Sequence, residues 1–427
     1  MCWGVNFMKG AFDSLHHKNY FSYRFNPKGM VSISHPYKNL KKFMILALFV
    51  ISCQVTNNRD KNQIITFNLR EFPKISTIKL SELGFVDIKY IPLETTDQSI
   101  ISRINEIKIG DGFFLIKLFN TILKYQDDGS FITKIGRVGR GPDEFTVAHD
   151  VDIDNKNQYI YIVSAWQKKF IVYSENGEFL RTFHCPQNTT NFKITEEGIL
   201  CYSINSFANV ETSYNLIDTG GRIIKSFPNM YPYNGNPNTT IFEENLFYRF
   251  KNRLFKKEIY SDTVYVFEKI SFKPHLAIEH GEKLLTTKAR SNSPPLLLLE
   301  NFISQKNLFE FGDYIYYEFM YDFKIGSYNV LRGLIGSKKN NFQFLINSEI
   351  GLINDLDGGP NIWPKTIKDD ETLISWIDAI KLKNHVISDA FINSTPKYPE
   401  KKKELEKLAN SLKETDNPVL MLVRLKR

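Results

Sequence analysis

Three aspartates alternate along one short segment, and their carboxylates are the groups of this sequence best suited to holding a cation. Asp150, Asp152 and Asp154 are separated by single apolar residues. Alternate side chains of a β-strand project to the same face, so an extended backbone would gather the three carboxylates. Calcium prefers such oxygen ligands, but an EF-hand loop would need Gly at Asn155 and Glu at Tyr161. We therefore hypothesise a calcium site, with the ordinary polarity of an edge strand as the alternative.

A glycine-rich segment just before these aspartates carries two arginines. Gly136–Phe145 reads GRVGRGPDEF, which matches neither common phosphate-loop pattern, and Pro142 leads toward a strand and not a helix. A structural turn is therefore favoured over a nucleotide site. Arg137 and Arg140 are candidates for binding a carboxylate bidentately, and solvent-exposed arginines are the alternative. Trp166 is a candidate for stacking on a sugar ring, although aromatic residues also pack β-sheets.

The other residue types that perform catalysis form no linear motif. Five of the eight histidines follow residue 53, but neither an HExxH nor a G-x-S-x-G motif occurs. Cys185 and Cys201 have no CxxC or zinc-type spacing; a disulfide and two free thiols both remain open. We nominate no catalytic residue and no cofactor besides the hypothetical calcium. Sites assembled from distant loops would leave no such motif, so an enzyme is disfavoured and not excluded.

The elements that position these residues are short strands in a repeating order. Tyr159–Phe183 reads as three strands, and Asn176-Gly177 between the last two is typical of a hairpin turn, since both residues tolerate positive φ. Similar units surround Gly129 and Gly221. The three turn glycines are 48 and 44 residues apart. A strand repeat of that length is typical of β-propeller blades.

We therefore predict an all-β fold, a six-bladed β-propeller, with seven blades as the alternative. A final strand at Val419–Leu425 would close the ring by pairing with strands from the beginning of the domain. One helix is expected at Lys397–Leu412, where leucines recur on one face. Ser291–Leu298 is expected to be a connecting loop.

The N-terminal region resembles an export signal. Lys41-Lys42 precede Phe43–Ile51, an apolar run too short to span a bilayer, and the run leads to Cys53. The last residues resemble a lipobox, whose cysteine is lipidated. A signal anchor or a cleaved secretory peptide with an incidental cysteine is the alternative. Gln54 follows the cysteine where Asp would favour inner-membrane retention, so we expect an outer-membrane lipoprotein of the cell envelope, facing either the periplasm or the surface.

These observations divide the chain into four segments. Residues 1–29 read as an over-long gene-model extension, 30–53 as the signal peptide, 54–63 as a tether and 64–427 as one propeller domain. The formal charge of +8 comes mostly from the first 53 residues. The nearly neutral remainder gives no electrostatic reason to expect nucleic-acid binding. The expected membrane contact is through the lipid alone.

Several segments together resemble the six-bladed β-propeller lipoproteins of Bacteroidetes-type bacteria, a family distantly similar to NHL-repeat propellers. The matching segments are Tyr90–Thr95, Gly136–Phe145, Asp262–Tyr265 and Asn354–Gly359. One departure is Asp143, where the family pattern has Gly. The resemblance implies the propeller fold and an envelope location, and it implies no particular activity.

Two functional hypotheses follow from the sequence. The first is a non-enzymatic ligand-binding or scaffold lipoprotein whose partner is an oligosaccharide, a peptide or another envelope protein. The second is a metal-dependent hydrolase or lactonase with its site in the axial funnel of the propeller. An inward cluster of carboxylates and histidines would favour the enzyme, whereas an aromatic-lined or featureless funnel would favour binding.

Overall fold

The computed structural model describes residues 64–205, 210–233, 241, 243–326, 330–340 and 342–426. These residues belong to one compact unit, residues 62–427. Cys53 and the predicted segments 1–29, 30–53 and 54–63 lie outside the described residues.

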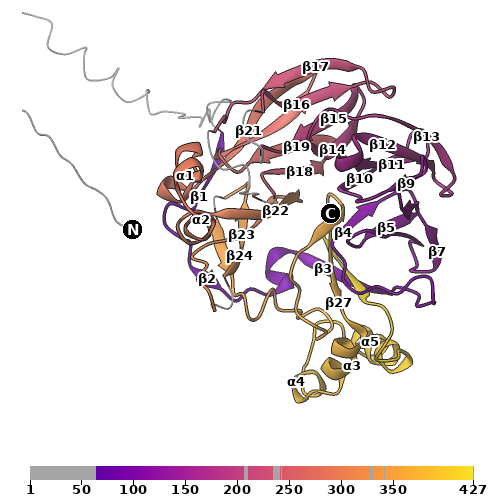
Figure 1. Cartoon of the computed structure of the whole chain (residues 1–427). Helices are drawn as coiled ribbons and strands as arrows, with labels where there is room; N and C mark the ends of the chain where they lie inside the picture. Colours follow the sequence, from indigo (N-terminus) through magenta and orange to yellow (C-terminus); the bar gives the residue numbers. More distant parts are fainter. Residues whose placement is uncertain are drawn as a thin grey trace, which may run out of the picture. The chain divides into compact units, whose positions relative to one another are not determined.

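Six sheets follow one another around a common axis and form the six blades of a β-propeller (Figure 1). In each of the first five blades, four antiparallel strands follow in chain order from the axis outward. Blade 1 consists of β4 (Glu106–Ile109), β5 (Phe113–Lys117), β6 (Ile122–Gln126) and β7 (Phe131–Lys134). Blade 2 consists of β10 (Asp150–Asp154), β11 (Tyr159–Ser164), β12 (Lys169–Ser174) and β13 (Phe179–His184). Blade 3 consists of β14 (Thr189–Thr195), β15 (Gly198–Ser203), β16 (Thr212–Ile217) and β17 (Ile223–Pro228).

The second half of the ring continues the same pattern, and the predicted six-bladed architecture is confirmed. Blade 4 consists of β18 (Asn245–Phe250), β19 (Arg253–Glu258), β20 (Thr263–Glu268) and β21 (Ser271–Glu279). Blade 5 consists of β22 (Ser304–Phe311), β23 (Tyr314–Met320), β24 (Leu331–Ser337) and β25 (Gln343–Ile346). Blade 6 consists of β26 (Thr366–Asp369), β27 (Thr372–Ile377), β28 (Val419–Leu425) and β3 (Phe85–Pro92).

Blade 6 combines strands from both ends of the domain and closes the ring. The last strand, β28, lies antiparallel between β27 and the early strand β3, with Val419 opposite Pro92. The prediction that a C-terminal strand pairs with an N-terminal one is therefore confirmed. This pairing joins the first and last parts of the domain in one sheet. Neither β27 nor β3 therefore keeps an unpaired edge where the two parts meet.

Two short strands that precede β3 extend the outer edges of blades 4 and 5. β1 (Ile65–Asn68) lies parallel to β21, and β2 (Ile75–Ser76) lies parallel to β25. Each adds a fifth strand to its sheet. The segment from β1 to β3 therefore contacts three successive blades and covers edges that would otherwise expose unpaired peptide groups.

The apolar core is divided into layers between neighbouring blades. Between blades 2 and 3, for example, the Phe170 ring stacks on Phe183 with a centroid distance of 5.0 Å and meets Phe192 edge-on at 4.8 Å. Cys185 and Cys201 belong to the same layer, where both thiols are free and buried. Burial raises the pKa of the Cys185 thiol to about 11, so the thiol stays protonated at neutral pH.

Helical insertions account for the unusual length of this chain per blade. Blade 6 carries α3 (Ala379–Val386), α4 (Asp389–Ile392) and α5 (Pro399–Ser411) between β27 and β28, and α5 is the predicted helix. The prediction of a loop at 291–298 is wrong, because α1 (Thr287–Asn292) and α2 (Pro295–Asn301) occupy this region. Proline in the first turn and four leucines favour α2.

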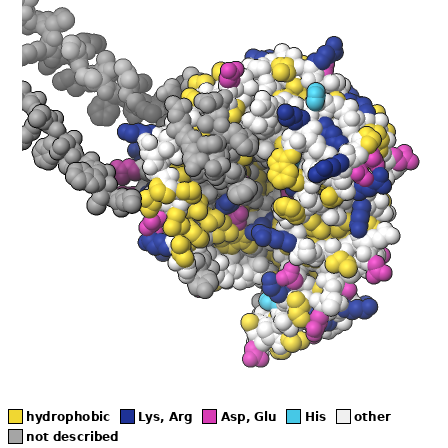
Figure 2. All heavy atoms as spheres, viewed as in Figure 1, with side chains coloured by type: hydrophobic (Ala, Val, Ile, Leu, Met, Phe, Trp, Pro, Cys, Tyr) yellow, Lys and Arg dark blue, Asp and Glu magenta, His cyan; other side chains and the backbone are white. Residues whose placement is uncertain are grey.

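The surface of the described unit mixes both signs of charge. Figure 2 shows basic and acidic side chains interspersed with apolar ones on one face. Among the helices of the described residues, none is both long enough and apolar enough to cross a membrane.

Candidate functional site

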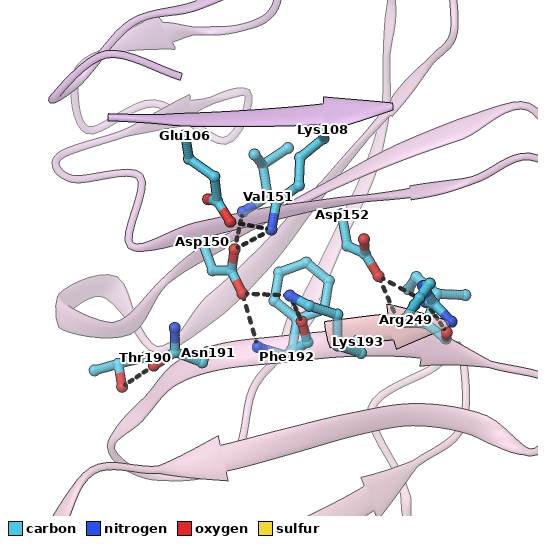
Figure 3. A network of polar contacts seen from close by, with 11 residues as sticks. Glu106, Lys108, Asp150, Val151, Asp152, Thr190, Asn191, Phe192, Lys193 and Arg249 are labelled. Atoms are coloured by element: carbon cyan, nitrogen blue, oxygen red, sulfur yellow. Dashed lines mark hydrogen bonds and ion pairs between the residues drawn. The ribbon is translucent and has the colours of Figure 1, made fainter. Parts of the chain in front are cut away.

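The three predicted aspartates lie on β10, the innermost strand of blade 2. Figure 3 shows two of them, Asp150 and Asp152, with their partners. The Asp150 carboxylate accepts a hydrogen bond from the backbone N–H of Phe192 at 3.0 Å, and Asp152 accepts one from Ile194 at 2.8 Å. Both donors belong to β14, whose inner edge has no partner strand. The two carboxylates therefore satisfy backbone groups that the axial edge of blade 3 leaves unpaired.

Cationic side chains from three other inner strands surround Asp150 and Asp152. The Lys108 and Lys193 ammonium groups lie 3.3 and 3.1 Å from the two Asp150 oxygens, and Arg249 lies 3.2 Å from Asp152. Lys108 also pairs with Glu106. Burial alone would raise the Asp150 pKa, but the two lysines lower it to about 2. This axial network joins the inner strands of blades 1 to 4 and fills the space around Asp150 with ammonium groups.

Asp154 points its carboxylate into its own hairpin turn. It accepts hydrogen bonds from the backbone N–H and the side-chain amide of Asn157 at 3.1 and 2.8 Å. The three aspartates therefore have three separate sets of partners. Within the described part of the chain, no group of three or more His, Cys, Asp or Glu side chains is placed to hold a metal ion. The geometry gives no support to the calcium site or to a metal-dependent hydrolase.

The two predicted arginines lie on the connection between blades 1 and 2. Arg137 pairs within its own loop, with Nε 2.7 Å from Glu144 and Nη2 3.2 Å from Asp143. Arg140 is exposed, and no ion pair to another described residue is found for it. Arg137 is therefore already neutralised within its own loop, and binding of a ligand carboxylate by Arg137 and Arg140 stays a prediction.

The glycine-rich segment itself fills the wedge between blades 1 and 2. Its β8 (Arg137–Val138) and β9 (Glu144–Phe145) form a short parallel pair. The Lys169 ammonium donates to the Gly141 carbonyl at 2.9 Å, which ties the loop to β12, the third strand from the axis. The favoured interpretation of this segment as a structural turn between blades agrees with these contacts.

Trp166 stands on the β11–β12 turn with 74% of its surface exposed. Its ring meets the His149 ring edge-on at a centroid distance of 5.4 Å. The His149 Nδ1 in turn accepts from the backbone N–H of Ala165 at 3.2 Å. Burial lowers the His149 pKa, and nearby Lys117 lowers it further, so the imidazole is neutral at pH 7. An exposed indole is thus held by a neutral, oriented imidazole.

Gln167 fixes the conformation of the same turn. Its side-chain oxygen accepts from the Ser164 hydroxyl at 2.8 Å and from the Thr146 N–H at 2.9 Å. The turn ends at Lys168, whose φ of 52° lies in the left-handed region. Such a backbone costs roughly 1 kcal/mol for a non-glycine residue and persists only where surrounding contacts hold it. The turn is therefore rigid in the form that presents Trp166.

The neighbouring β5–β6 turn presents a second exposed aromatic side chain, Phe119, with 72% of its surface exposed. Asn120 beside it donates from Nδ2 to the Thr146 carbonyl at 3.3 Å. Since Thr146 also binds Gln167, one residue ties both turns together. Asn120 Oδ1 and Thr146 Oγ1 are buried and make no hydrogen bond within the described part of the chain.

We call this group the two-turn site; it comprises Phe119, Asn120, Thr146, His149 and Trp166. It offers two exposed aromatic side chains on turns that Thr146 ties together, with the unpaired oxygens of Asn120 and Thr146 buried between them. Of these residues, sequence reasoning found only Trp166. Phe119 carried a usable signal, because an aromatic residue next to Asn120 in the short link between two apolar runs is unlike the usual turn composition.

The family comparison identifies a match to a domain of unknown function, DUF4934, over residues 64–424. The chain belongs to this family. Among solved structures, a Bacteroides fragilis protein described as exported shares 18% identity, covers 86% of this chain and 100% of its own, and has a TM-score of 0.66. A DUF4221 family member from Bacteroides vulgatus shares 11% identity, covers 80% of this chain and 97% of its own, and has a TM-score of 0.48.

The DUF4934 match and the fold shared with the Bacteroides fragilis protein confirm the predicted membership of a Bacteroidetes-type propeller family. The likeness to the Bacteroides fragilis protein shows a shared fold and, at this identity, nothing about a shared ligand. None of the curated proteins matches this DUF4934 chain.

Proposed function

We propose that this DUF4934 protein is a lipid-anchored binding protein of the cell envelope that holds an oligosaccharide at the two-turn site. The observation that carries the proposal is Trp166, a largely exposed indole on a turn fixed by His149 and Gln167. A side chain ordered before binding loses little conformational entropy on binding, so it can contribute most of its contact energy to affinity.

The chemistry of the site favours a sugar over a purely apolar ligand. A sugar ring has an apolar C–H face that stacks on an indole and hydroxyl groups that hydrogen-bond at its rim. Phe119 provides a second platform on the adjacent turn. Asn120 and Thr146 lie between the two turns and tie them together, and their unpaired oxygens are buried beneath the surface on which the ligand would lie.

The binding test uses the full chain and a panel of bacterial and host oligosaccharides, followed by calorimetry with the tightest ligand. We expect Trp166→Ala to weaken binding at least tenfold, as is usual for a buried-on-binding tryptophan, and Trp166→Phe to restore part of it. Phe179→Ala removes an aromatic residue that is also exposed, on β13, and serves as the matched control. Unchanged affinity in Trp166→Ala, or no oligosaccharide bound by the wild type, contradicts the proposal.

The envelope location rests on Cys53 and the apolar run that precedes it. A diacylated cysteine supplies about 0.8 kcal/mol for each CH₂ group buried in the bilayer, which is enough for stable anchoring by two chains. Cys53→Ala should release the protein from the membrane fraction and abolish fatty-acid labelling. Membrane association that survives Cys53→Ala would refute the lipid anchor while leaving oligosaccharide binding to be judged separately.

A further inference from the structure

The two ends of the propeller axis are covered by different sets of loops. Because the four strands of a blade alternate in direction, the links between second and third strands and the connections between blades lie on one face, which we call the connection face. The turns between first and second strands and between third and fourth strands lie on the opposite face, which we call the hairpin face. The exposed side chains of the two faces can therefore be compared.

The connection face carries the most exposed large apolar side chains of the described residues. They are between 66 and 82% exposed, and they are Ile100, Phe119, Trp166, Met230, Ile325 and Ile387. The hairpin face instead has exposed acidic residues in its turns, among them Asp111, Asp128, Glu178 and Glu196. Single apolar side chains are common on protein surfaces, whereas their concentration on one face indicates contact with an apolar partner.

The apolar surface of the connection face is most continuous at the beginning of α2. Pro294–Leu297 are four successive exposed apolar residues, and the next residue, Leu298, is buried in an apolar cluster with Tyr260 and Leu285. The helix therefore uses one leucine to attach to the domain and leaves two in solvent. A run of exposed apolar residues is unfavourable in water unless it meets a partner. Figure 2 shows apolar side chains gathered over α1 and α2.

The link between β23 and β24 adds a further apolar side chain beside α2. The Phe323 N–H donates to the Leu299 carbonyl of the helix at 3.2 Å. Two residues later, Ile325 is 82% exposed. Lys324 between them pairs with Asp322 at 3.1 Å, so the charge next to Ile325 is balanced. We call the exposed apolar side chains of the helix and this link the apolar wedge, which comprises Leu296, Leu297 and Ile325.

We propose that the connection face lies on a lipid bilayer, with the apolar wedge inserted into the bilayer surface. Separate apolar side chains, each on its own loop, can enter a fluid bilayer without the complementary surface that a protein partner would have to supply. The acidic hairpin face then points away from the membrane, whose lipid headgroups are in part anionic. Ten residues separate Cys53 from Ile64, so a lipid on Cys53 would hold the domain within roughly 40 Å of the bilayer.

This inference rests on the proposed lipid anchor, which supplies the bilayer, and it adds an orientation of the domain on that bilayer. The two-turn site belongs to the same face, because Phe119 and Trp166 stand on links between second and third strands. An oligosaccharide held there would accordingly lie at the bilayer surface, as the headgroup of a glycolipid does.

The experiment uses the full protein purified from membranes and reconstituted into vesicles of phosphatidylethanolamine and phosphatidylglycerol. An environment-sensitive fluorophore is attached to Ile325→Cys or, as the control, to Glu196→Cys in an exposed turn of the hairpin face. Cys185 and Cys201 are buried, so the protein without a new cysteine gives the labelling background. We expect the emission at Ile325→Cys to shift to shorter wavelength on vesicles and to be quenched by spin-labelled lipid, with neither change at Glu196→Cys.

A second substitution tests whether the wedge acts as a unit. Leu296→Glu, added to the labelled Ile325→Cys protein, places a charge in the wedge and should abolish the spectral shift. Leu296 is exposed, so the variant should keep the wild-type circular dichroism. A shift that survives Leu296→Glu overturns the insertion of the wedge.

Flotation of the vesicles and fatty-acid labelling report the anchor separately from the orientation. Protein that floats while the fluorophore at Ile325→Cys stays in water keeps the anchor and overturns the docking. A shift at Ile325→Cys in protein without a fatty acid supports the docking and refutes the anchor. A shift at Glu196→Cys, or one at Ile325→Cys that occurs only in native membranes and not on pure lipid, overturns the proposal, and the latter assigns the wedge to a protein partner.

Discussion

Asp150 connects three blades through one buried carboxylate. Its oxygens meet Lys108 of blade 1 and both the backbone of Phe192 and the Lys193 ammonium of blade 3. Burying a charge is expensive unless it is paired and hydrogen-bonded, and here both conditions are met. The group therefore contributes to stability chiefly because its removal would leave the Lys193 ammonium and the Phe192 N–H without this carboxylate and Lys108 with Glu106 alone.

The first prediction concerns acid stability. The Asp150 pKa of about 2 lies below its ordinary value of 3.8, so its contribution is present above about pH 4 and is lost as the pH falls toward 2. Over that pH range, the shift in the Asp150 pKa corresponds to a loss of about 2 kcal/mol in the free energy of unfolding. Asp150→Asn should lower the free energy of unfolding at pH 7 by roughly 3 kcal/mol and flatten the decline between pH 4 and 2, as measured by urea unfolding across pH.

Glu178→Gln is the control for this experiment, because Glu178 is an exposed carboxylate of the same blade. It should change neither the stability at pH 7 nor the acid slope. An Asp150→Asn protein with the acid slope of the wild type would show that other carboxylates dominate the acid transition.

The sequence predicts the placement of the three aspartates but not the residues with which they interact. Alternation of Asp150, Asp152 and Asp154 correctly placed them on an extended segment, since strand periodicity is local. Their partners could not be inferred, because Lys193 and Arg249 come from strands of other blades. The sequence shows three carboxylates together, and only the fold shows which cations compensate them.

Strands and turns were the most predictable elements. The hairpin around Gly177 and the blade before it follow from alternation and turn composition, which act over a few residues. Helices α1 and α2 were missed because short apolar runs do not distinguish buried loops from helices by period. The two-turn site was missed for another reason: its turns meet only when blades 1 and 2 pack together.

Two glycines of blade 1 allow the energetic cost of a left-handed backbone to be distinguished from the cost of a clash between two blades. Gly129 has φ of 92°, and a Cβ there would lie 2.1 Å from the Pro92 carbonyl oxygen of blade 6. Gly112 has φ of 77° with open space around it. Gly112→Ala should cost about 1 kcal/mol from the left-handed backbone alone. Gly129→Ala should cost clearly more, since the backbone of β3 must also move, as thermal unfolding of both variants would measure.

Equal melting temperatures for the two variants would contradict this prediction. That result would mean that the turn between β6 and β7 can move away from blade 6 without loss of stability. It would also weaken the interpretation of the Gly129–Pro92 contact as a constraint on the spacing of blades 1 and 6.

At the scale of the whole molecule, stability depends on the closure of blade 6 by β28. Deleting residues 419–427 would expose the facing edges of β27 and β3. Exposed edges of apolar strands pair with other chains. The truncated protein should therefore self-associate and bind a hydrophobic dye, as measured by size-exclusion chromatography and fluorescence. Deleting only residues 426 and 427 is the control, and a monomeric 419–427 deletion with wild-type unfolding would contradict the prediction.

The wrapping of the segment from β1 to β3 has a consequence for the order of events during synthesis. These strands leave the ribosome first, yet β1 pairs with β21, β2 with β25 and β3 with β28. Pairing between strands so far apart along the chain is slow, because a long intervening segment must be ordered before the contact forms. Strands β1 to β3 therefore stay unpaired until the last blades have been synthesised. During that interval the incomplete ring has to be protected from aggregation.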